Sequence, residues 1–436
     1  MKFLPENIFK KSYYTTYRIC FLVSIFVLFL QMWGNSGNLS VYAATLTNPH
    51  SMHGYITNYD DIHYEMNYKM LRGKYPADEW RFGYTLRRVG MYIAGYPFFL
   101  VGGFYYGGEI TSFLLVLLSF IILIRFVNRT YGTRAAYAAM LIAGTYTGIM
   151  YWIGSPFAQN TIFPICVVVY ILMIKLSQPM TLKQAALIWA GIGLLFTGYD
   201  LFIMFMPAVF LFYLFQKNWK WALLSALLIF LPQVLVEMIL QSVGVHMHNE
   251  NKDLYALIIR SYFTGFSFPD LWMHIKQLPG ILFYNLMDAG FYLLPALFFI
   301  SYLIGRLRFG FRLSYIERCI LMGIACLWLF LNLAPTYESH WQLRGIDIAR
   351  IYQPVFIVML MYPVRLIAHR QETKSSTWKL AMPALTLYAL CVFALNMGGW
   401  YGSEYTQTMY YRFYRHSDPD AYLKNIELYG RRPLGL

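Results

Sequence analysis

Two adjacent carboxylates, Asp60 and Asp61, lie in a stretch whose residue types suit acid–base chemistry. A helix that begins near Asp60 would place four polar side chains on one face, at spacings of 4, 3 and 4 residues: Asp61, Glu65, Tyr68 and Arg72. A carboxylate here could take the proton from an acceptor hydroxyl, or hold a metal ion beside a reacting carbon. His63, Tyr64 and Glu65 would line such a site. The alternative is that one aspartate caps the helix, which leaves the other available.

Three arginines are candidates for holding a phosphate group. Arg344 and Arg350 lie in a polar stretch, 334–354, that leads into an apolar run, and Arg88 precedes another apolar run. The planar guanidinium group presents a fork of donors that fits phosphate oxygens. The alternatives for Arg344 and Arg350 are headgroup contacts or local ion pairs. For Arg88 we favour the anchoring of an interfacial helix by snorkelling.

Other polar residues carry weaker signals. Asp200 lies between two apolar runs and is expected at the outer mouth of a bundle, where it would line the site. Glu237 lies inside an apolar run, where acids are costly and often functional, but it could also bond backbone freed by a nearby proline. His246, His248 and Asp253 are too loosely spaced to predict a metal site. We predict no resident metal or other cofactor, with a divalent cation as the open alternative.

The composition is typical of a protein that crosses a membrane many times. Of 436 residues, 58% are hydrophobic and 13% are charged, against roughly 25% charged residues in soluble domains. The five cysteines all fall in or beside apolar runs, so we predict neither a disulfide framework nor a thiol catalyst. We expect an all-α polytopic membrane protein with about 11 transmembrane helices.

The predicted spans follow the apolar runs. They are 17–33, 110–127, 135–153, 161–174, 185–197, 201–215, 221–242, 281–304, 319–333, 355–367 and 380–397. The segment 89–106 is apolar but interrupted by glycine and proline, so we interpret it as an interfacial or re-entrant piece. Residues 1–400 then form one bundle. Its long first outer loop, 34–107, carries short interfacial helices, and 401–436 is a short outer tail.

The charge distribution predicts which loops face the cytoplasm. The loops assigned there hold more than half of the 35 Lys and Arg residues but only Glu6, Glu317 and Glu372 among 21 acidic residues. The net charge of +14 is therefore a topology signal, and we predict no nucleic-acid partner. Asp60 and Asp61 come to lie outside, in a multi-pass protein of a bacterial plasma (inner) membrane. A cleaved signal peptide is the less favoured alternative for the first span.

The layout resembles that of the GT-C superfamily, integral membrane glycosyltransferases that use polyprenyl-phosphate sugars. The resemblance rests on the segments 59–64 (YDDIHY), 71–76 (LRGKYP) and 84–88 (YTLRR), ahead of Tyr96 and Pro97. It implies that Asp60 or Asp61 is the catalytic base or its partner. It also implies a polyprenyl-phosphate sugar donor among the membrane lipids, and a lipid, glycan or protein acceptor.

By the same resemblance, Arg344 or Arg350 would hold the donor phosphate as it leaves. A cation there stabilises the negative charge that grows on the phosphate. Two segments differ from many relatives: 155–160 (SPFAQN) has no acid, and 197–200 (TGYD) has no lysine. A second acid and a metal are therefore not supported by this comparison of motifs.

Three alternatives remain at this stage. A transporter or flippase is the first, although only Glu237 lies deep in a predicted span and no repeat relates two halves. A polysaccharide polymerase or ligase is the second, and in it the outer arginines would matter more than Asp60 and Asp61. The third is a non-catalytic scaffold subunit, in which the acidic pair is only a helix cap.

Overall fold

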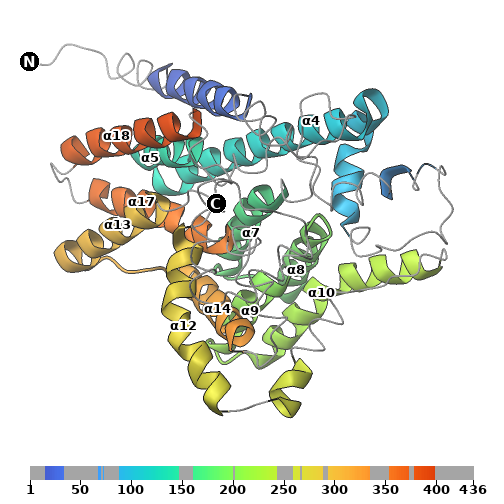
Figure 1. Ribbon diagram of the computed structural model, residues 1–436. Helices are drawn as coiled ribbons and strands as arrows, with labels where there is room; N and C mark the ends of the chain where they lie inside the picture. Colours follow the sequence, from blue (N-terminus) through green and yellow to red (C-terminus); the bar gives the residue numbers. More distant parts are fainter. Residues whose placement is uncertain are drawn as a thin grey trace, which may run out of the picture.

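The protein is described by a computed structural model over residues 15–33, 67–69, 72, 88–146, 161–199, 202–242, 259–265, 268–287, 293–333, 353–372 and 378–397. Within these ranges all regular secondary structure is helical, which confirms the all-α prediction for this part of the chain (Figure 1). An N-terminal helix, Thr15–Trp33, comes first. It is followed by α4 (Val89–Tyr131), α5 (Thr133–Gly144), α7 (Ile162–Leu176), α8 (Leu182–Phe196), α9 (Phe202–Leu214), α10 (Trp219–Ser242), α12 (Phe268–Met287), α13 (Leu293–Phe309), α14 (Tyr315–Asn332), α17 (Gln353–Glu372) and α18 (Trp378–Met397).

The predicted span 281–304 is not confirmed, because two helices overlap it and residues 288–292 lie outside the described ranges. The structure divides it between α12, which ends at Met287, and α13, which begins at Leu293. The sequence between them contains Asp288 and Gly290, residue types that favour helix ends over helix interiors. Each of the other predicted spans overlaps a helix, although α5 ends at Gly144 and the rest of 135–153 is largely outside the described ranges.

The described helices support a membrane protein, but not the full number of predicted spans. Three of them are long and apolar enough to cross a bilayer: Thr15–Trp33, the Gly107–Tyr131 part of α4, and α10. Shorter apolar helices, among them α7 and α8, accompany these three. The total of eleven spans and the outward orientation therefore stay predictions.

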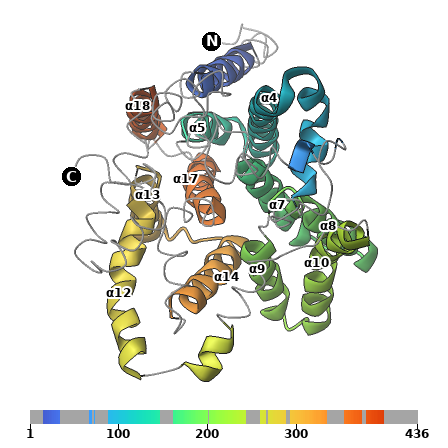
Figure 2. The same cartoon turned by 45° about the vertical axis from the view of Figure 1, so that its right-hand side comes forward.

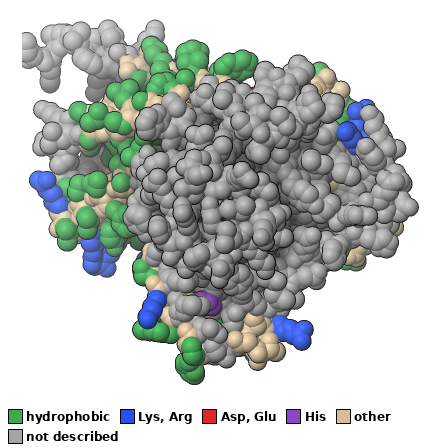
Figure 3. Space-filling view, viewed as in Figure 1, with side chains coloured by type: hydrophobic (Ala, Val, Ile, Leu, Met, Phe, Trp, Pro, Cys, Tyr) green, Lys and Arg blue, Asp and Glu red, His purple; other side chains and the backbone are tan. Residues whose placement is uncertain are grey.

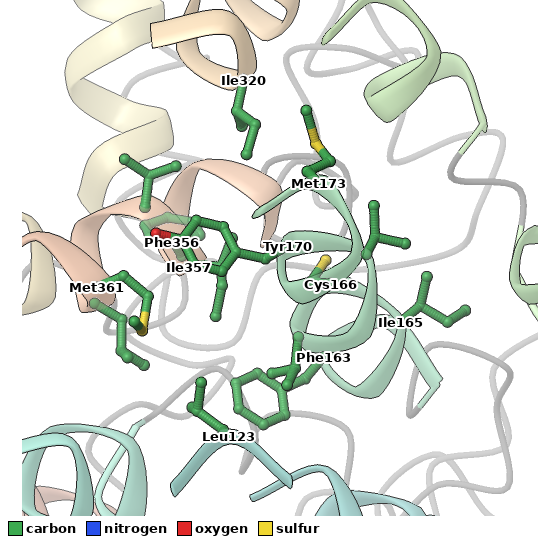
Figure 4. Packing of buried hydrophobic residues seen from close by; sticks show 14 of the residues in the cluster. Leu123, Phe163, Ile165, Cys166, Tyr170, Met173, Ile320, Phe356, Ile357 and Met361 are labelled. Atoms are coloured by element: carbon green, nitrogen blue, oxygen red, sulfur yellow. The ribbon is translucent and has the colours of Figure 1, made fainter. Parts of the chain in front are cut away.

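Packed helix pairs form a closed series around the bundle. The series runs α4, α5, α17, α14, α9, α10, α8, α7 and back to α4 (Figure 2). Helix α17 also packs against α7, α13 and α18, so it is the most enclosed helix. Nearly every side chain from Phe356 to Val364 is buried. Figure 4 shows Phe356, Ile357 and Met361 of α17 facing Phe163, Cys166 and Tyr170 of α7.

The bundle has two ends that can be named by their residues. At the Glu317 end, Tyr131 at the end of α4 lies next to Glu317 of α14 and Arg365 of α17. Helices α8 and α14 begin at this end with capping boxes, Thr181 with Gln184 and Ser314 with Glu317, which explains where they start. At the opposite end, called the Arg88 end below, α8 ends beside the start of α4.

A sharp kink separates the two parts of α4. Gly103 has φ 73°, a left-handed value that glycine adopts without strain. A Cβ atom on Gly107 would lie 2.5 Å from the backbone nitrogen of Phe99, so the chain folds back on itself there. Residues 89–103 begin beside the end of α8 and end where the long part of α4 begins, and both points belong to the Arg88 end. This placement fits the predicted interfacial or re-entrant piece.

Candidate functional site

Of the predicted site residues, only Arg88 lies in the part of the chain that the structure describes. The others fall outside it: Asp60, Asp61, His63, Tyr64, Glu65, Asp200, Arg344 and Arg350. For some of them, described residues nearby in the sequence have contacts that bear on the proposal below.

Tyr68 anchors the segment that follows the acidic pair. It lies in the short helical stretch 67–69, is buried, and donates a hydrogen bond from its hydroxyl to the Phe99 carbonyl at 2.9 Å. The two rings meet edge to face, with centroids 5.2 Å apart. Arg72 Nη1 donates to the Tyr68 hydroxyl at 3.2 Å. The predicted shared face is therefore confirmed for Tyr68 and Arg72.

Arg88 is buried at the start of α4. Its guanidinium carbon lies 4.3 Å from the centre of the Tyr199 ring, which is the geometry of a cation–π contact. Stacking of this kind fixes the plane of the guanidinium and hence the direction of its N–H donors. A snorkelling anchor would place the charged group at the surface, whereas Arg88 is 7% exposed.

A close backbone approach holds Arg88 in this position. The Gly90 amide donates to the Thr197 carbonyl at 3.0 Å, at the end of α8. A Cβ atom on Gly90 would lie 2.9 Å from the Gly198 nitrogen, so a glycine is needed here. The Thr161 hydroxyl, at the start of α7, donates to the Gly198 carbonyl at 3.3 Å. Three helix ends thus converge on the segment that leads into Asp200.

A second polar cluster lies at the same end and was not predicted. Asn396 Nδ2 donates to Gln31 Oε1 at 2.9 Å and to the Thr145 carbonyl at 3.0 Å. Gln31 Nε2 donates to the Gly144 carbonyl at 2.8 Å. These bonds join the N-terminal helix, α5 and α18, in the way that polar side chains hold membrane helices together.

The short helix 259–265 also docks on this end. Tyr262, in the helix 259–265, stacks on Phe330 with ring centroids 5.2 Å apart and donates its hydroxyl to the Phe330 carbonyl. Burial raises the pKa of Tyr262, so the hydroxyl stays protonated and able to donate. The helix 259–265 is thereby tied to the end of α14.

Sequence reasoning also missed a buried ion pair at the Glu317 end. Glu317 is fully buried, pairs with Arg365, and accepts a hydrogen bond from the Tyr170 hydroxyl at 3.2 Å. Figure 4 shows Tyr170 of α7 extending toward α17. Two signals could have found it: a Ser-x-x-Glu capping pattern at Ser314, and a lone arginine within the apolar run of α17.

No group of three or more His, Cys, Asp or Glu side chains placed to hold a metal ion occurs within the described ranges. No protein family, curated protein or solved structure matches the chain. The resemblance to GT-C glycosyltransferases therefore rests on the sequence segments given above.

Proposed function

We propose that the protein transfers a sugar from a polyprenyl-phosphate donor to an acceptor hydroxyl on the outer side of a bacterial inner membrane. One observation carries this proposal: the segment after the acidic pair and the buried arginine are fixed on the same kinked piece of α4. The Tyr68 hydroxyl is hydrogen-bonded to the Phe99 carbonyl of α4, and Arg88 is the residue just before α4 begins. Arg88 and Phe99 are eleven positions apart, which spans roughly 16 Å along a helix.

Chain length supports placing the aspartates near Arg88. Asp61 precedes Tyr68 by seven residues, which reach at most about 25 Å when extended and about 10 Å when helical. Because the Tyr68 hydroxyl is hydrogen-bonded to Phe99, this reach supports the proposal that the aspartates act near residues 88–103. Asp200, which follows Tyr199 directly, belongs to the same surroundings.

In the proposed reaction, Asp60 or Asp61 accepts the proton of the acceptor hydroxyl. The acceptor oxygen forms a bond to the anomeric carbon while the bond from that carbon to the phosphate oxygen breaks. The polyprenyl phosphate leaves with the bonding electrons, and a guanidinium group stabilises its growing negative charge. Arg88, Arg344 and Arg350 are the candidates for that group. A single displacement of this kind inverts the anomeric centre.

The test is sugar transfer by isolated membranes supplied with a panel of labelled polyprenyl-phosphate sugars. Wild type is compared with Asp60→Asn, Asp61→Asn, Arg88→Gln and Arg344→Ala at equal expression. Loss of the general base is expected to lower transfer by about 10²–10⁴-fold in one aspartate variant. Glu372→Gln, at the far end of α17, serves as a matched carboxylate control and is expected to keep full transfer.

Transfer that survives both aspartate substitutions at the wild-type rate would make the acidic pair structural. In that case a loss in Arg344→Ala alone would favour the polymerase or ligase alternative.

A transporter is a second candidate, because α10 carries buried polar side chains, among them Gln233 and Glu237. Gln233 is 1% exposed, and neither of its amide atoms has a hydrogen-bond partner among the described residues. Glu237 lies one turn further along the same apolar helix and is also buried. Substrate movement across sealed vesicles that is lost in Glu237→Gln, but kept in both aspartate variants, would favour transport.

A further inference from the structure

Helix α13 presents an apolar stripe that no other described element covers. The stripe consists of large exposed side chains at i, i+1, i+4, i+5 and i+8: Phe299, Ile300, Leu303, Ile304 and Leu307. The opposite side of the helix, including Phe298 and Gly305, packs against Tyr362 of α17. A stripe of this composition and period fits a helix side that contacts lipid acyl chains.

Arginines surround the end of this stripe. Arg306 and Arg308 flank Leu307, which is 81% exposed, and Arg312 and Arg318 follow in the next connection and helix. All four arginines are exposed. Glu317 is the only acidic residue in the sequence 293–333, and it is fully buried against Arg365. Within 293–333 the exposed charged side chains are therefore all basic.

The connection that carries Arg312 is held in one conformation. Its Phe311 amide donates to the Gly305 carbonyl at 2.8 Å, and the Tyr362 hydroxyl donates to the Phe311 carbonyl at 3.3 Å. The Phe311 ring stacks on His369, and the Arg365 guanidinium lies over it at 5.2 Å. Gly310 turns the chain with φ 63°. The spacing between the arginines of α13 and Arg312 is thus set before any ligand arrives.

We propose that this face is a binding site for an anionic phospholipid of the leaflet at the Glu317 end. The headgroup phosphate would be held by the forks of Arg306, Arg308 and Arg312, and the acyl chains would lie along the stripe of α13. Arginine suits this role because its planar donors match phosphate oxygens two at a time. The α7–α8 and α9–α10 regions at this end carry exposed lysines, namely Lys175, Lys183, Lys217 and Lys220, and the α4–α5 connection carries the exposed Arg129 and Arg134.

A lipid fits this site better than free phosphate, since charge and apolar surface adjoin. Figure 3 shows Lys and Arg side chains next to hydrophobic ones along the left edge of the molecule, where α13 and α17 lie in Figure 1. An isolated phosphate would use only the arginines and leave the stripe unused. The proposal does not depend on the glycosyl-transfer proposal.

The experiment is a titration of the full-length protein in detergent, followed by native mass spectrometry. Phosphatidylglycerol, which is anionic, is compared with phosphatidylcholine, which carries the same phosphate but no net charge. The test variant is Arg306→Ala/Arg308→Ala/Arg312→Ala. The matched control, Lys183→Ala/Lys217→Ala/Lys220→Ala, removes the same charge from exposed residues of the same end. Glycerol 3-phosphate is added to compete in a separate arm.

Wild type is expected to bind phosphatidylglycerol at least about tenfold more tightly than phosphatidylcholine. The arginine variant should lose about tenfold or more in that affinity, while the lysine control stays within about threefold. If the alanine variant does not fold, Arg306→Lys/Arg308→Lys/Arg312→Lys keeps the charge. This variant is expected to bind about threefold more weakly, because lysine lacks the paired donors of the guanidinium group.

Several results would overturn the proposal. Equal losses in the arginine and lysine variants would indicate diffuse attraction instead of a site. Displacement of the lipid by glycerol 3-phosphate at equal concentration would assign the arginines to soluble phosphate. A two-chain species that disappears in the arginine variant would assign this face to a second copy of the protein.

Discussion

The buried pair of Glu317 and Arg365 is the clearest case of one residue depending on another. Two charges taken out of water lose hydration, and their attraction offsets that cost only while both partners remain. Glu317 has three further bonds, since it caps α14 through Ser314 and accepts from Tyr170. It therefore links the start of α14 to α7 and α17.

We predict that Glu317→Gln destabilises the protein by about 3 kcal/mol, because it leaves the Arg365 charge largely buried without its partner. Glutamine at this position still fits the capping box, so the loss of stability reports only the removal of the Glu317 charge. The measurement is the thermal unfolding of purified protein in detergent. Adding Arg365→Met should recover part of the loss, which a double-mutant cycle quantifies. Arg318→Ala, exposed beside Glu317, should change stability by about 0.5 kcal/mol or less, and an equal shift in both variants would refute the prediction.

At the scale of the helix, glycines set how closely α8 and α10 approach. A Cβ atom on Gly193 would lie 2.5 Å from the Ile229 carbonyl oxygen, whereas nothing lies within 4 Å of one on Gly191. These two glycines share the same helix and differ only in the side that they face. Small residues of this kind let membrane helices pack backbone to backbone.

Gly193→Ala should therefore destabilise the protein by about 1–3 kcal/mol, since α10 backbone has to move away. Gly191→Ala should be neutral or slightly stabilising, because alanine favours the helix and meets no neighbour. Thermal unfolding of both variants in the same detergent measures the difference. Equal stability of the two would mean that α8 and α10 do not pack as closely as the structure has them.

Periodicity and composition were sufficient to predict most helices, but not every helix end. Long apolar runs predicted the N-terminal helix and α10 well, because these runs are long and contain few charged residues. They did not separate α12 from α13 within 281–304, where Asp288 and Gly290 lie among apolar residues. Capping patterns at Ser314 and Thr181 mark helix starts that hydropathy alone misses.

The site could be predicted only in part, for a different reason. The pairing of Tyr68 with Arg72 follows from helical spacing, which is a local property. The contacts of Tyr68 with Phe99 and of Arg88 with Tyr199 join segments 31 and 111 residues apart, and no local pattern specifies them. The same holds for the pairing of Glu317 with Arg365.

For the whole molecule, the decisive question is whether residues 89–103 cross the membrane. The long part of α4 ends beside Glu317, and α8 begins at the same Glu317 end. The start of the long part of α4 and the end of α8 therefore both lie at the Arg88 end, where Gly90 bonds to Thr197. Residues 89–103 join these two points. A piece that starts and finishes at one end of a bundle adds no crossing.

We therefore predict that reporters fused after Gly107 and after Gly154 lie on the outer side, and one after Gly132 on the cytoplasmic side. Alkaline phosphatase should be active at the first two positions and inactive at the third, and a fluorescent protein should give the reverse pattern. The basic residues Arg125, Arg129 and Arg134 around Gly132 favour this orientation through the positive-inside rule. Inversion of all three readings would mean that 89–103 does cross. The arginine-rich end of α13 would then face outward, and the anionic lipid would have to be sought in the opposite leaflet.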